Sequence, residues 1–356
     1  MARQQSISAV SLLGLATAVP PYRVGQAEAA ELARRIFGPV LKRYPQLADV
    51  FLNTGIETRY TVIPVDDIVA LKGWPERTAI YFEGASALFV EAARAALAKA
   101  KLQPDDIDIV VTVSSTGIAT PSLETRVAKT LGLRTDVARV PVVGLGCAGG
   151  VSGLSIGARL ARGTPGANVL VVAVELCTMA FRGDRVNKAD VISAAIFADG
   201  AAAAVLRCAP DEPAAIRIGA AAEHMWPSTL DIMGWSIDPI GFGVILSRSL
   251  PKFIESKLAK PAREFARRAG LSKNPKFICH PGGAKVVSAI EAALDLRCGT
   301  LSAERETLRD FGNMSAPTAL FVLDRNLKSG FAGAAVLSAM GPGFTATFLA
   351  IEALTG

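Results

Sequence analysis

The chain has 356 residues, of which 51% are hydrophobic and 20% charged, so we expect a large core in one large domain or two fused ones. The formal net charge is +6, but the basic residues are mostly interspersed with acids and form no stripe interleaved with aromatics, which argues against nucleic-acid binding. The five cysteines lack a C-x-x-C pair and there are only two histidines, so a zinc site is not expected and reduced cytosolic thiols fit better than disulfides.

The first residues, MARQQSISAVSLLGLATAVPPYR, resemble a signal peptide because Arg3 precedes an apolar run and an ATA triplet. Serines interrupt the run and two prolines follow it, so we interpret residues 7–17 as a strand that enters a loop. No stretch reaches the roughly 18 uninterrupted apolar residues of a membrane helix. We expect a cytoplasmic protein without stable membrane insertion.

Helix and strand patterns alternate along the chain. Residues 84–102 predict an amphipathic helix, and residues 106–117 predict a buried strand that ends in a loop. Residues 137–146 predict another strand, followed over 147–163 by a helix of unusually small residues. The continuous apolar run over 168–177 is typical of a strand covered on both faces. This alternation predicts a layered α/β fold.

The second part of the chain echoes the first. Three pairs of segments are similar: 197–208 with 329–343, 108–117 with 275–283, and 147–160 with 282–296. An internal duplication joined near residues 207–219 explains all three, giving an N-terminal half over 1–210 and a C-terminal half over 211–356. We therefore predict a five-layer αβαβα sandwich with the two glycine-opened helices, 147–160 and 282–296, at its centre.

Cys147 lies among five glycines in VVGLGCAGGVSGL, residues 142–154. At the N-terminus of a helix its thiolate would be stabilised by free N–H groups and the helix dipole, and its own N–H could bind an oxyanion. The glycines would then leave space for a thioester to approach. On this stretch alone, a small core residue in a tight turn remains the alternative.

Two further polar residues stand at chain turns. His280, in FICHPGG, follows a predicted strand and is directed into a loop, where it could pair with a thiolate or simply form a structural hydrogen bond. His224 lacks such a setting, and we predict a structural or surface role for it. Asn313, in DFGNMSAPTALFVL, follows Gly312 in a predicted sharp turn, where asparagine is common for conformational reasons alone.

Four motifs together resemble the type III polyketide synthases of the chalcone-synthase family: GLGCAGG, CHPGGAKVVSAIEAAL, FGNMSAP and SAMGPGFT, in this order. The spacings agree as well, with His280 133 positions after Cys147 and Asn313 33 positions after His280. Further matches occur at 57–62, 114–124, 179–184 and 196–206, so the resemblance spans nearly the whole chain.

The resemblance implies a thiolase-like acyltransferase that works as a homodimer on acyl-CoA and malonyl-CoA without a metal, a cofactor or a carrier protein. By motif, Cys147 would hold the starter acyl group as a thioester and His280 would keep it as a thiolate. His280 and Asn313 would stabilise the enolate formed when malonyl-CoA loses carbon dioxide. We accordingly expect Cys147 to titrate well below the usual thiol pKa of about 8.5.

The resemblance also places residues around the substrate. Phe197 matches a gatekeeping phenylalanine, and Val244, counted back from Pro251, matches the second gatekeeping position. The other matched cavity positions are Cys177, Ala180, Thr120, Trp235 and Ser315. Small groups among them favour a medium- or long-chain fatty acyl starter and an alkylpyrone or alkylresorcinol product. The bulk of Trp235 and Phe197 favours the alternative, a malonyl-primed enzyme that makes a small aromatic.

The CoA-phosphate positions depart from the family. Where plant enzymes carry basic residues, this chain has Gln46, Asp49 and Asn53. The nearby candidates are Lys42, Arg43 and Arg59, and the resemblance adds the backbone of Gly282, Gly283 and Ala284. Residues 251–276 carry eight basic and two acidic residues, which we interpret as a solvated face, with attraction to CoA or an anionic membrane surface as the alternative.

Other functions fit less well. An initiating β-ketoacyl-ACP synthase uses the same three residue types, but its histidine usually lies in a Gln-Ala-Asn segment, whereas Pro281 and Gly282 follow His280 here. HMG-CoA synthase requires a catalytic glutamate, for which Glu83 is weak support. A non-catalytic thiolase-fold partner would lack the nucleophile, and a membrane-surface lipid binder would not need the three groups.

Overall fold

The computed structural model describes residues 10–71, 73–182, 184–185, 187–210, 215–272 and 275–354. Its strands are β1 (Val10–Ala18), β2 (Tyr22–Gly25), β3 (Thr58–Thr61), β4 (Ile109–Val113), β5 (Ala138–Val142), β6 (Asn168–Leu176), β7 (Asp199–Arg207), β8 (Ile216–Met225), β9 (Met233–Ile237), β10 (Phe242–Leu246), β11 (Lys276–Cys279), β12 (Gly333–Gly341) and β13 (Thr345–Ala353).

Its α-helices are α1 (Gln26–Ile36), α2 (Gly38–Arg43), α3 (Val65–Ala70), α4 (Trp74–Ala100), α5 (Leu123–Leu131), α6 (Gly149–Gly163), α7 (Lys188–Ile196), α8 (Leu250–Lys257), α9 (Ala259–Arg268), α10 (Ala284–Ala293), α11 (Ser302–Phe311) and α12 (Thr318–Lys328). Short 3₁₀ helices are η1 (Pro45–Val50), η2 (Pro104–Asp106), η3 (Gly146–Ala148) and η4 (Cys177–Ala180). None of the helices in these described ranges is long and apolar enough to cross a membrane.

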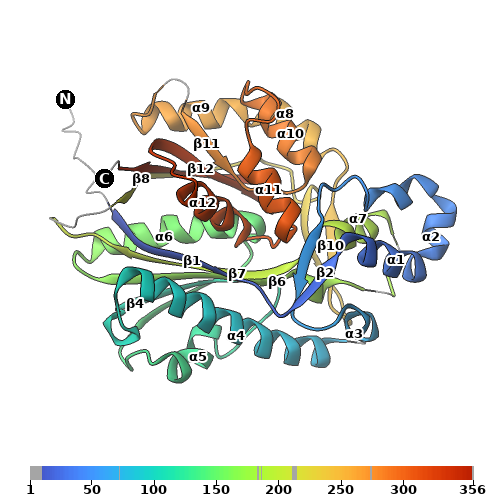
Figure 1. Ribbon diagram of the computed structural model, residues 1–356, viewed down its shortest axis with the longest axis horizontal. Helices are drawn as coiled ribbons and strands as arrows, with labels where there is room; N and C mark the ends of the chain where they lie inside the picture. Colours follow the sequence, from blue (N-terminus) through green and yellow to red (C-terminus); the bar gives the residue numbers. More distant parts are fainter. Residues whose placement is uncertain are drawn as a thin grey trace.

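Nine strands form one sheet in the order β11-β12-β13-β8-β1-β7-β6-β4-β5. Within the described residues, β1 and β8 pair over two residues, and this pairing joins the two parts of the sheet. Figure 1 shows the resulting layers from top to bottom: α8 to α10, the strands of the C-terminal part, α12 with α6, the strands of the N-terminal part, and finally α4 with α5. The predicted five-layer αβαβα, thiolase-like sandwich is thus confirmed.

Strand β6 confirms the prediction of a strand covered on both faces, because all nine of its residues are buried. Successive side chains of a strand point to opposite faces. Val169 and Val171 therefore pack in the core around α6 and α12, while Leu170 and Val172 pack in the core beneath α4. The sheet is consequently held between two apolar layers, which fixes its position beneath the site.

The second central helix is α12, which corrects the prediction that residues 282–296 occupy this place. Eight of the eleven residues of α12 are buried, among them Leu320 and Val322 in the core shared with α6. The predicted segment forms α10, which packs in the outer core with α8 and α9 through Val287 and Ile290. The prediction relied on glycines at the start of a helix as the sign of a central position. It failed because α12, the helix at this position, packs there through large apolar side chains instead.

The glycines of α6 serve close packing. A Cβ atom at Gly150 would lie 2.1 Å from the carbonyl oxygen of Ala316, and one at Gly157 would lie 2.6 Å from Val171. This finding differs from the prediction that the glycine run clears a path for substrate. Only Gly146, which precedes the cysteine, lines the cavity described below.

Candidate active site

Cys147, His280 and Asn313 come from three distant segments and line one cavity of about 530 Å³. This volume is usual for a small-molecule site. Cys147 lies in η3, which runs directly into α6; His280 follows β11; and Asn313 lies in the turn between α11 and α12. The structure therefore brings together the three residues that the sequence singled out, and we call this space the large cavity.

Backbone geometry positions Asn313. The preceding Gly312 has φ +70°, as the predicted sharp turn requires, and a Cβ there would lie 3.1 Å from Ala198. The amide nitrogen Nδ2 of Asn313 donates to the Gly282 carbonyl at 3.1 Å, and its Oδ1 accepts from the Ser315 N–H at 2.8 Å. The side-chain amide is therefore fixed against the loop that carries His280.

His280 is the most unusual polar group of the cavity. Its side chain is buried, its backbone N–H donates to Ser338 at 2.9 Å, and neither ring nitrogen has a hydrogen-bond partner within the described residues. Burial lowers the pKa of the His280 imidazole to about 4. A neutral imidazole with free nitrogens can accept a proton or donate to a bound oxygen.

Cys147 does not show the predicted low pKa. Burial raises the pKa of its thiol to about 11, and the charge of Glu175 adds to this increase, although hydrogen bonds with Ser315 and Asn313 oppose it. The direction of this shift is opposite to the one predicted, because desolvation outweighs the N-terminal end of the helix. Burial thus favours the neutral forms of both Cys147 and His280.

Glu175 is a buried polar residue that the sequence analysis missed. One of its oxygens accepts hydrogen bonds from the Ser115 N–H at 2.9 Å and the Thr116 hydroxyl at 2.7 Å, and burial raises the carboxyl pKa to about 7. The Ser115 hydroxyl in turn accepts from the N–H groups of Gly144 and Gly146, the two glycines just before Cys147. An acid inside the apolar run NVLVVAVELC could have indicated this network.

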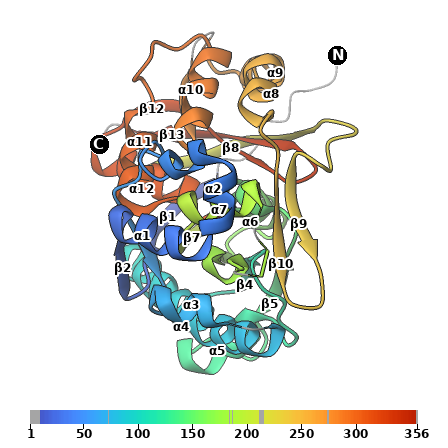
Figure 2. The same cartoon turned by 90° about the vertical axis from the view of Figure 1, so that its right-hand side faces the viewer.

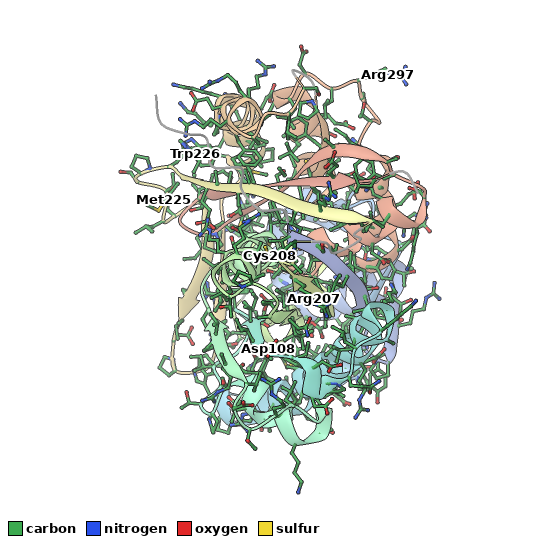
Figure 3. The ribbon with its side chains drawn as sticks, turned by 90° about the vertical axis from the view of Figure 1, so that its left-hand side faces the viewer. Asp108, Arg207, Cys208, Met225, Trp226 and Arg297 are labelled. Atoms are coloured by element: carbon green, nitrogen blue, oxygen red, sulfur yellow. The ribbon has the colours of Figure 1, made fainter. Side chains whose placement is uncertain are left out.

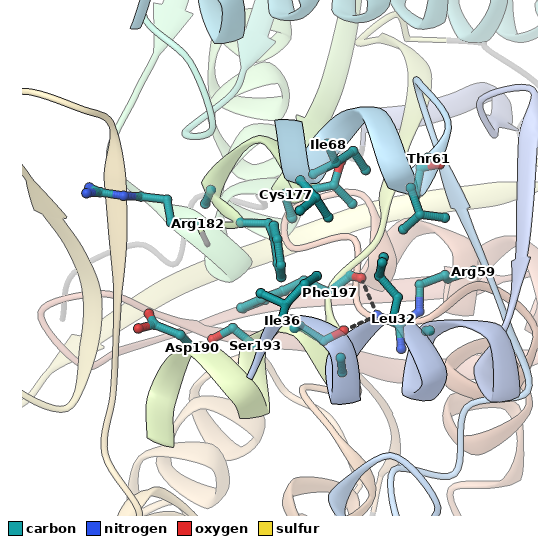
Figure 4. A pocket seen from close by; sticks show the side chains of 18 of the residues that line it. Leu32, Ile36, Arg59, Thr61, Ile68, Cys177, Arg182, Asp190, Ser193 and Phe197 are labelled. Atoms are coloured by element: carbon teal, nitrogen blue, oxygen red, sulfur yellow. Dashed lines mark hydrogen bonds between the residues drawn. The ribbon is translucent and has the colours of Figure 1, made fainter. Parts of the chain in front are cut away.

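The predicted cavity residues divide between two spaces. Phe197, Trp235, Val244 and Ser315 line the large cavity together with the three central groups. A smaller cavity of about 70 Å³, shown in Figure 4, is lined by Cys177 and Ala180 and by residues of α1 and α3. Phe197 and Val244 line both, so they form the wall between the two spaces. We call the second space the small cavity.

Thr120 lies apart from both cavities. Its side chain is exposed, and it is absent from the described residues that line either space. Glu83, the weak candidate for a catalytic acid, is exposed on α4 and also lines neither cavity. His224 is exposed at the end of β8, where its ring contacts Trp226 edge-on at 4.6 Å, as the predicted surface role requires. Trp226 and the exposed Met225 are labelled in Figure 3.

The residues predicted to bind CoA do not lie together in the structure. Gly282, Gly283 and Ala284 line the large cavity. Arg59 is buried, and its guanidinium donates to Gln26 and to the carbonyls of Ala194, Ala195 and Phe197, which contradicts its prediction as a phosphate ligand.

Lys42 and Arg43 lie together at the end of α2. Both are exposed, and Arg43 lines a shallow pocket on the surface beside the large cavity. The basic residues of α8 and α9 are exposed, as expected for a solvated face.

None of the five cysteines forms a disulfide in the described part of the chain; four are buried and Cys298 is exposed. Buried Cys208 is labelled in Figure 3, beside Arg207 at the end of β7.

Comparison with known proteins agrees with this geometry. Residues 1–210 match the family model of chalcone and stilbene synthases, N-terminal domain, and residues 217–355 match the C-terminal domain. The 1,3,6,8-tetrahydroxynaphthalene synthase of Streptomyces peucetius is 34% identical over 351 residues, covering 96% of this chain and 93% of that protein. A putative chalcone synthase of Bacillus subtilis is also 34% identical, covering 95% of this chain and 97% of that protein.

Comparison with solved structures supports the same family. The crystal structure of 1,3,6,8-tetrahydroxynaphthalene synthase from Streptomyces coelicolor, a bacterial type III polyketide synthase, aligns with a TM-score of 0.91 at 27% identity. The alignment covers 97% of this chain and all of that one. The chain therefore belongs to the chalcone and stilbene synthase family and is a type III polyketide synthase, an enzyme that transfers acyl groups.

Proposed function

We propose that Cys147 carries the starter acyl group and that His280 and Asn313 stabilise the enolate formed from malonyl-CoA. The observation that carries this proposal is the convergence of these three side chains on one cavity, with both nitrogens of His280 free. Because the thiol and the imidazole are both neutral, His280 takes the thiol proton as the sulfur attacks the starter thioester, and it passes this proton to the departing CoA thiolate. The N–H of the neutral His280 ring and the Asn313 amide then donate to the oxygen on which negative charge develops. No metal or cofactor enters this scheme.

The Cys147→Ala variant tests this division of roles. We expect no polyketide from the variant, while carbon dioxide release from malonyl-CoA stays measurable, because the groups that stabilise the enolate remain. The exposed Cys298 offers the matched control, since Cys298→Ala removes a thiol outside the cavity. Product yield from Cys147→Ala equal to that of the wild type would refute the proposal.

We propose a fatty acyl starter whose tail occupies the small cavity, giving an alkylpyrone or an alkylresorcinol. Most residues that line the small cavity are apolar, including all those from α1 and α3, and the cavity begins where Phe197 and Val244 form the wall of the large cavity. Its lining includes the small side chains of Cys177 and Ala180. Each buried methylene contributes roughly 0.8 kcal/mol, so such a space favours an alkyl tail over acetyl. Its volume of about 70 Å³ favours a medium chain over a very long one.

A starter series measures this preference. We expect kcat/KM to rise from acetyl-CoA to hexanoyl- and lauroyl-CoA and to fall for palmitoyl-CoA. Ala180→Leu fills the small cavity without touching the large one, so it should lower the lauroyl-CoA rate roughly tenfold and spare acetyl-CoA. A flat series, or an equal loss for every starter, would exclude the small cavity as the tail site.

A malonyl-primed enzyme that makes a small aromatic is the second candidate. It is supported by the bulk beside the wall between the cavities, where the Phe197 ring lies 6.4 Å from the ring of Trp235, a residue that lines the large cavity. The relatives named for 1,3,6,8-tetrahydroxynaphthalene, a small polyhydroxylated aromatic, support it as well. Full product from malonyl-CoA alone would favour this candidate.

We also propose that the protein is a homodimer through the edge strand β5. Val143, directly after β5, and Ile118, in the loop after β4, are 68% and 60% exposed. Val143 lies in the short segment that leads from β5 into η3 and Cys147, so a second copy covering it would also support the site. Val143→Asp should give a monomer in analytical ultracentrifugation; a monomeric wild type would contradict the proposal.

A further inference from the structure

The end of α7 connects two parts of the proposed site. Phe197 directly follows the last residue of this helix and forms part of the wall between the two cavities. The Asn313 N–H donates to the Ile196 carbonyl at 2.9 Å, and the Ala198 N–H donates to the Asn313 carbonyl at 2.9 Å. We call residues 194–198 the wall segment. Its position sets both the wall and the backbone of Asn313.

One buried side chain supplies most of the donors that this segment needs. The last carbonyls of an α-helix have no partner within the helix. The Nη1 of Arg59 donates to the Ala194 carbonyl at 2.7 Å and to the Phe197 carbonyl at 2.9 Å, and its Nη2 donates to the Ala195 carbonyl. Figure 4 marks the first two of these hydrogen bonds with dashed lines. Three carbonyls of the wall segment thus depend on Arg59.

Arg59 is in turn held by α1. The Oε1 of Gln26, the first residue of α1, accepts from the Arg59 Nη2, while the Gln26 Nε2 donates to the Ala195 carbonyl at 3.2 Å. Figure 2 looks onto this end of the molecule, where α1 and α7 lie side by side. The side chains of Gln26 and Arg59 therefore tie α1 and β3 to the end of α7.

The charge of Arg59 suits this position. Its side chain is 4% exposed, and burial lowers the pKa of the guanidinium to about 10, although the charge of Asp199 opposes this shift. The group therefore stays charged at neutral pH. A cation at the C-terminal end of a helix is favoured by the helix dipole. The backbone carbonyls of α7 are thus suitable partners for a buried arginine.

The wall between the cavities has two sides that come from different parts of the chain. Phe197 belongs to the wall segment, whereas Val244 belongs to β10, which pairs with β9 in a separate small sheet. The passage between the cavities therefore depends on where the wall segment lies. Arg59 also lines the small cavity, so the side chain that holds Phe197 borders the space in which we place the starter tail.

We infer that Arg59 is a positioning residue that holds Phe197 in the wall between the cavities and thereby determines which starter chains the enzyme accepts. This inference rests on the proposed function, in which the starter tail passes the wall into the small cavity. The planar guanidinium reaches three carbonyls from two nitrogens, whereas a lysine has only one nitrogen. The arginine of the segment 57–62 thus has a role other than the phosphate binding first expected of it.

The first test is the ratio of kcat/KM for lauroyl-CoA to kcat/KM for acetyl-CoA, with malonyl-CoA as the extender, in Arg59→Lys. This ratio does not depend on how much of the variant is folded, so it separates positioning from a loss of stability. We expect the ratio to fall roughly tenfold, because the wall segment loses donors and no longer holds Phe197 in one place. Gln26→Leu keeps the cation but removes a group that orients it, so we expect a smaller fall.

Arg162→Lys is the matched control. Arg162, near the end of α6, donates to the carbonyls of Ile218 and Gly219 at 3.0 and 2.7 Å, and it is not among the described residues that line either cavity. This variant should keep the starter ratio of the wild type. A fall as large as that in Arg59→Lys would overturn the inference, because it would show a general effect of losing an arginine that binds backbone carbonyls.

Hydrogen exchange of the backbone keeps this inference separate from the proposed reaction. In Arg59→Lys, the N–H groups of Ala198 and Asn313 should exchange roughly tenfold faster than in the wild type, while those of α12 keep their rates. A wild type without preference among starters would contradict the tail proposal, and exchange alone would then decide the role of Arg59.

Unchanged exchange in Arg59→Lys would overturn the inference in every case. An unchanged starter ratio would overturn it where the wild type prefers lauroyl-CoA. If Arg59→Lys does not fold, the same two measurements on Gln26→Leu decide the question.

Discussion

The two parts of the sheet have the same strand order on either side of the β1–β8 junction, yet they carry different chemistry. Outward from the junction, β1, β7, β6 and β4 correspond to β8, β13, β12 and β11. The central helices α6 and α12 correspond in the same way, and Cys147 precedes the first as Asn313 precedes the second. One architecture used twice therefore brings two helix starts to the same place, where one supplies the sulfur and the other the amide.

The loops after β4 and β11 show where the two parts diverge. His280 follows β11, whereas Ser115 and Thr116 follow β4. In each part a buried glutamate accepts a hydrogen bond from the backbone near the strand end: Glu175 from Ser115 and Glu304 from Cys279. The supporting carboxylates are thus paired, while the imidazole exists on one side only. The repeated architecture thus places equivalent strand ends and helix starts around one cavity. The chemical group present at each of these places depends on a single residue.

Replacing Asn313 removes the amide that the C-terminal part supplies to the site, and we expect this change to have the largest effect. Asn313→Ala removes the amide donor, and loss of one such donor costs about 100- to 1,000-fold in rate, here measured as carbon dioxide release from malonyl-CoA. Asn326→Ala is the matched control, since its buried amide donates to the Val322 carbonyl inside α12, away from both cavities. Decarboxylation that survives in Asn313→Ala would assign the enolate to another group.

The structure brings together the three residues that the sequence singled out, whereas the predicted symmetry was partly wrong. The sequence identified Cys147, His280 and Asn313 because each is next to a glycine or proline where one helix or strand ends and another begins. Such a feature is local and can be recognised from the amino-acid sequence alone. The repeat was misread by one element, since residues 197–208 form β7 whereas residues 329–343 contain β12, the counterpart of β6. Buried alanine-rich strands look alike, and their pairing depends on contacts between distant residues.

The pKa of Cys147 could not be predicted from the sequence for a related reason. Helix position is a local feature that favours the thiolate, whereas burial depends on every segment that closes the cavity, and burial dominates here. Glu175 was missed because its importance comes from Ser115, 60 residues away in the chain.

Filling the contact between the central helices tests whether the two parts depend on each other. In Gly150→Ala the new Cβ would meet the Ala316 carbonyl oxygen at 2.1 Å, just before α12, so we expect a loss of about 2–3 kcal/mol in the free energy of unfolding. Gly163→Ala, at the end of the same helix, meets nothing within 4 Å and should stabilise by about 0.5 kcal/mol. Urea unfolding at one protein concentration measures both, and equal stability of the two variants would show that the helices do not pack this closely.

The buried glutamates give the smallest expected effect, through the dependence of stability on pH. Burial raises the pKa of Glu304 to about 7, so between pH 5 and 7 the folded state binds a proton that the unfolded state has released. The free energy of unfolding therefore falls as pH rises through this window, by about 1 kcal/mol from pH 5.5 to 6.5 for this group alone. Glu304→Gln keeps an oxygen that can accept from the Cys279 N–H, but this side chain cannot titrate. The stability of the variant should therefore fall less steeply over the same pH range.

Glu306→Gln, on the partly exposed side of α11 facing Arg325, is the control, and its stability should fall with pH as steeply as that of the wild type. If Glu175→Gln flattens the curve as Glu304→Gln does, the two carboxylates are equivalent supports; an unchanged or steeper curve in Glu304→Gln would show that this carboxyl is already charged in the folded protein.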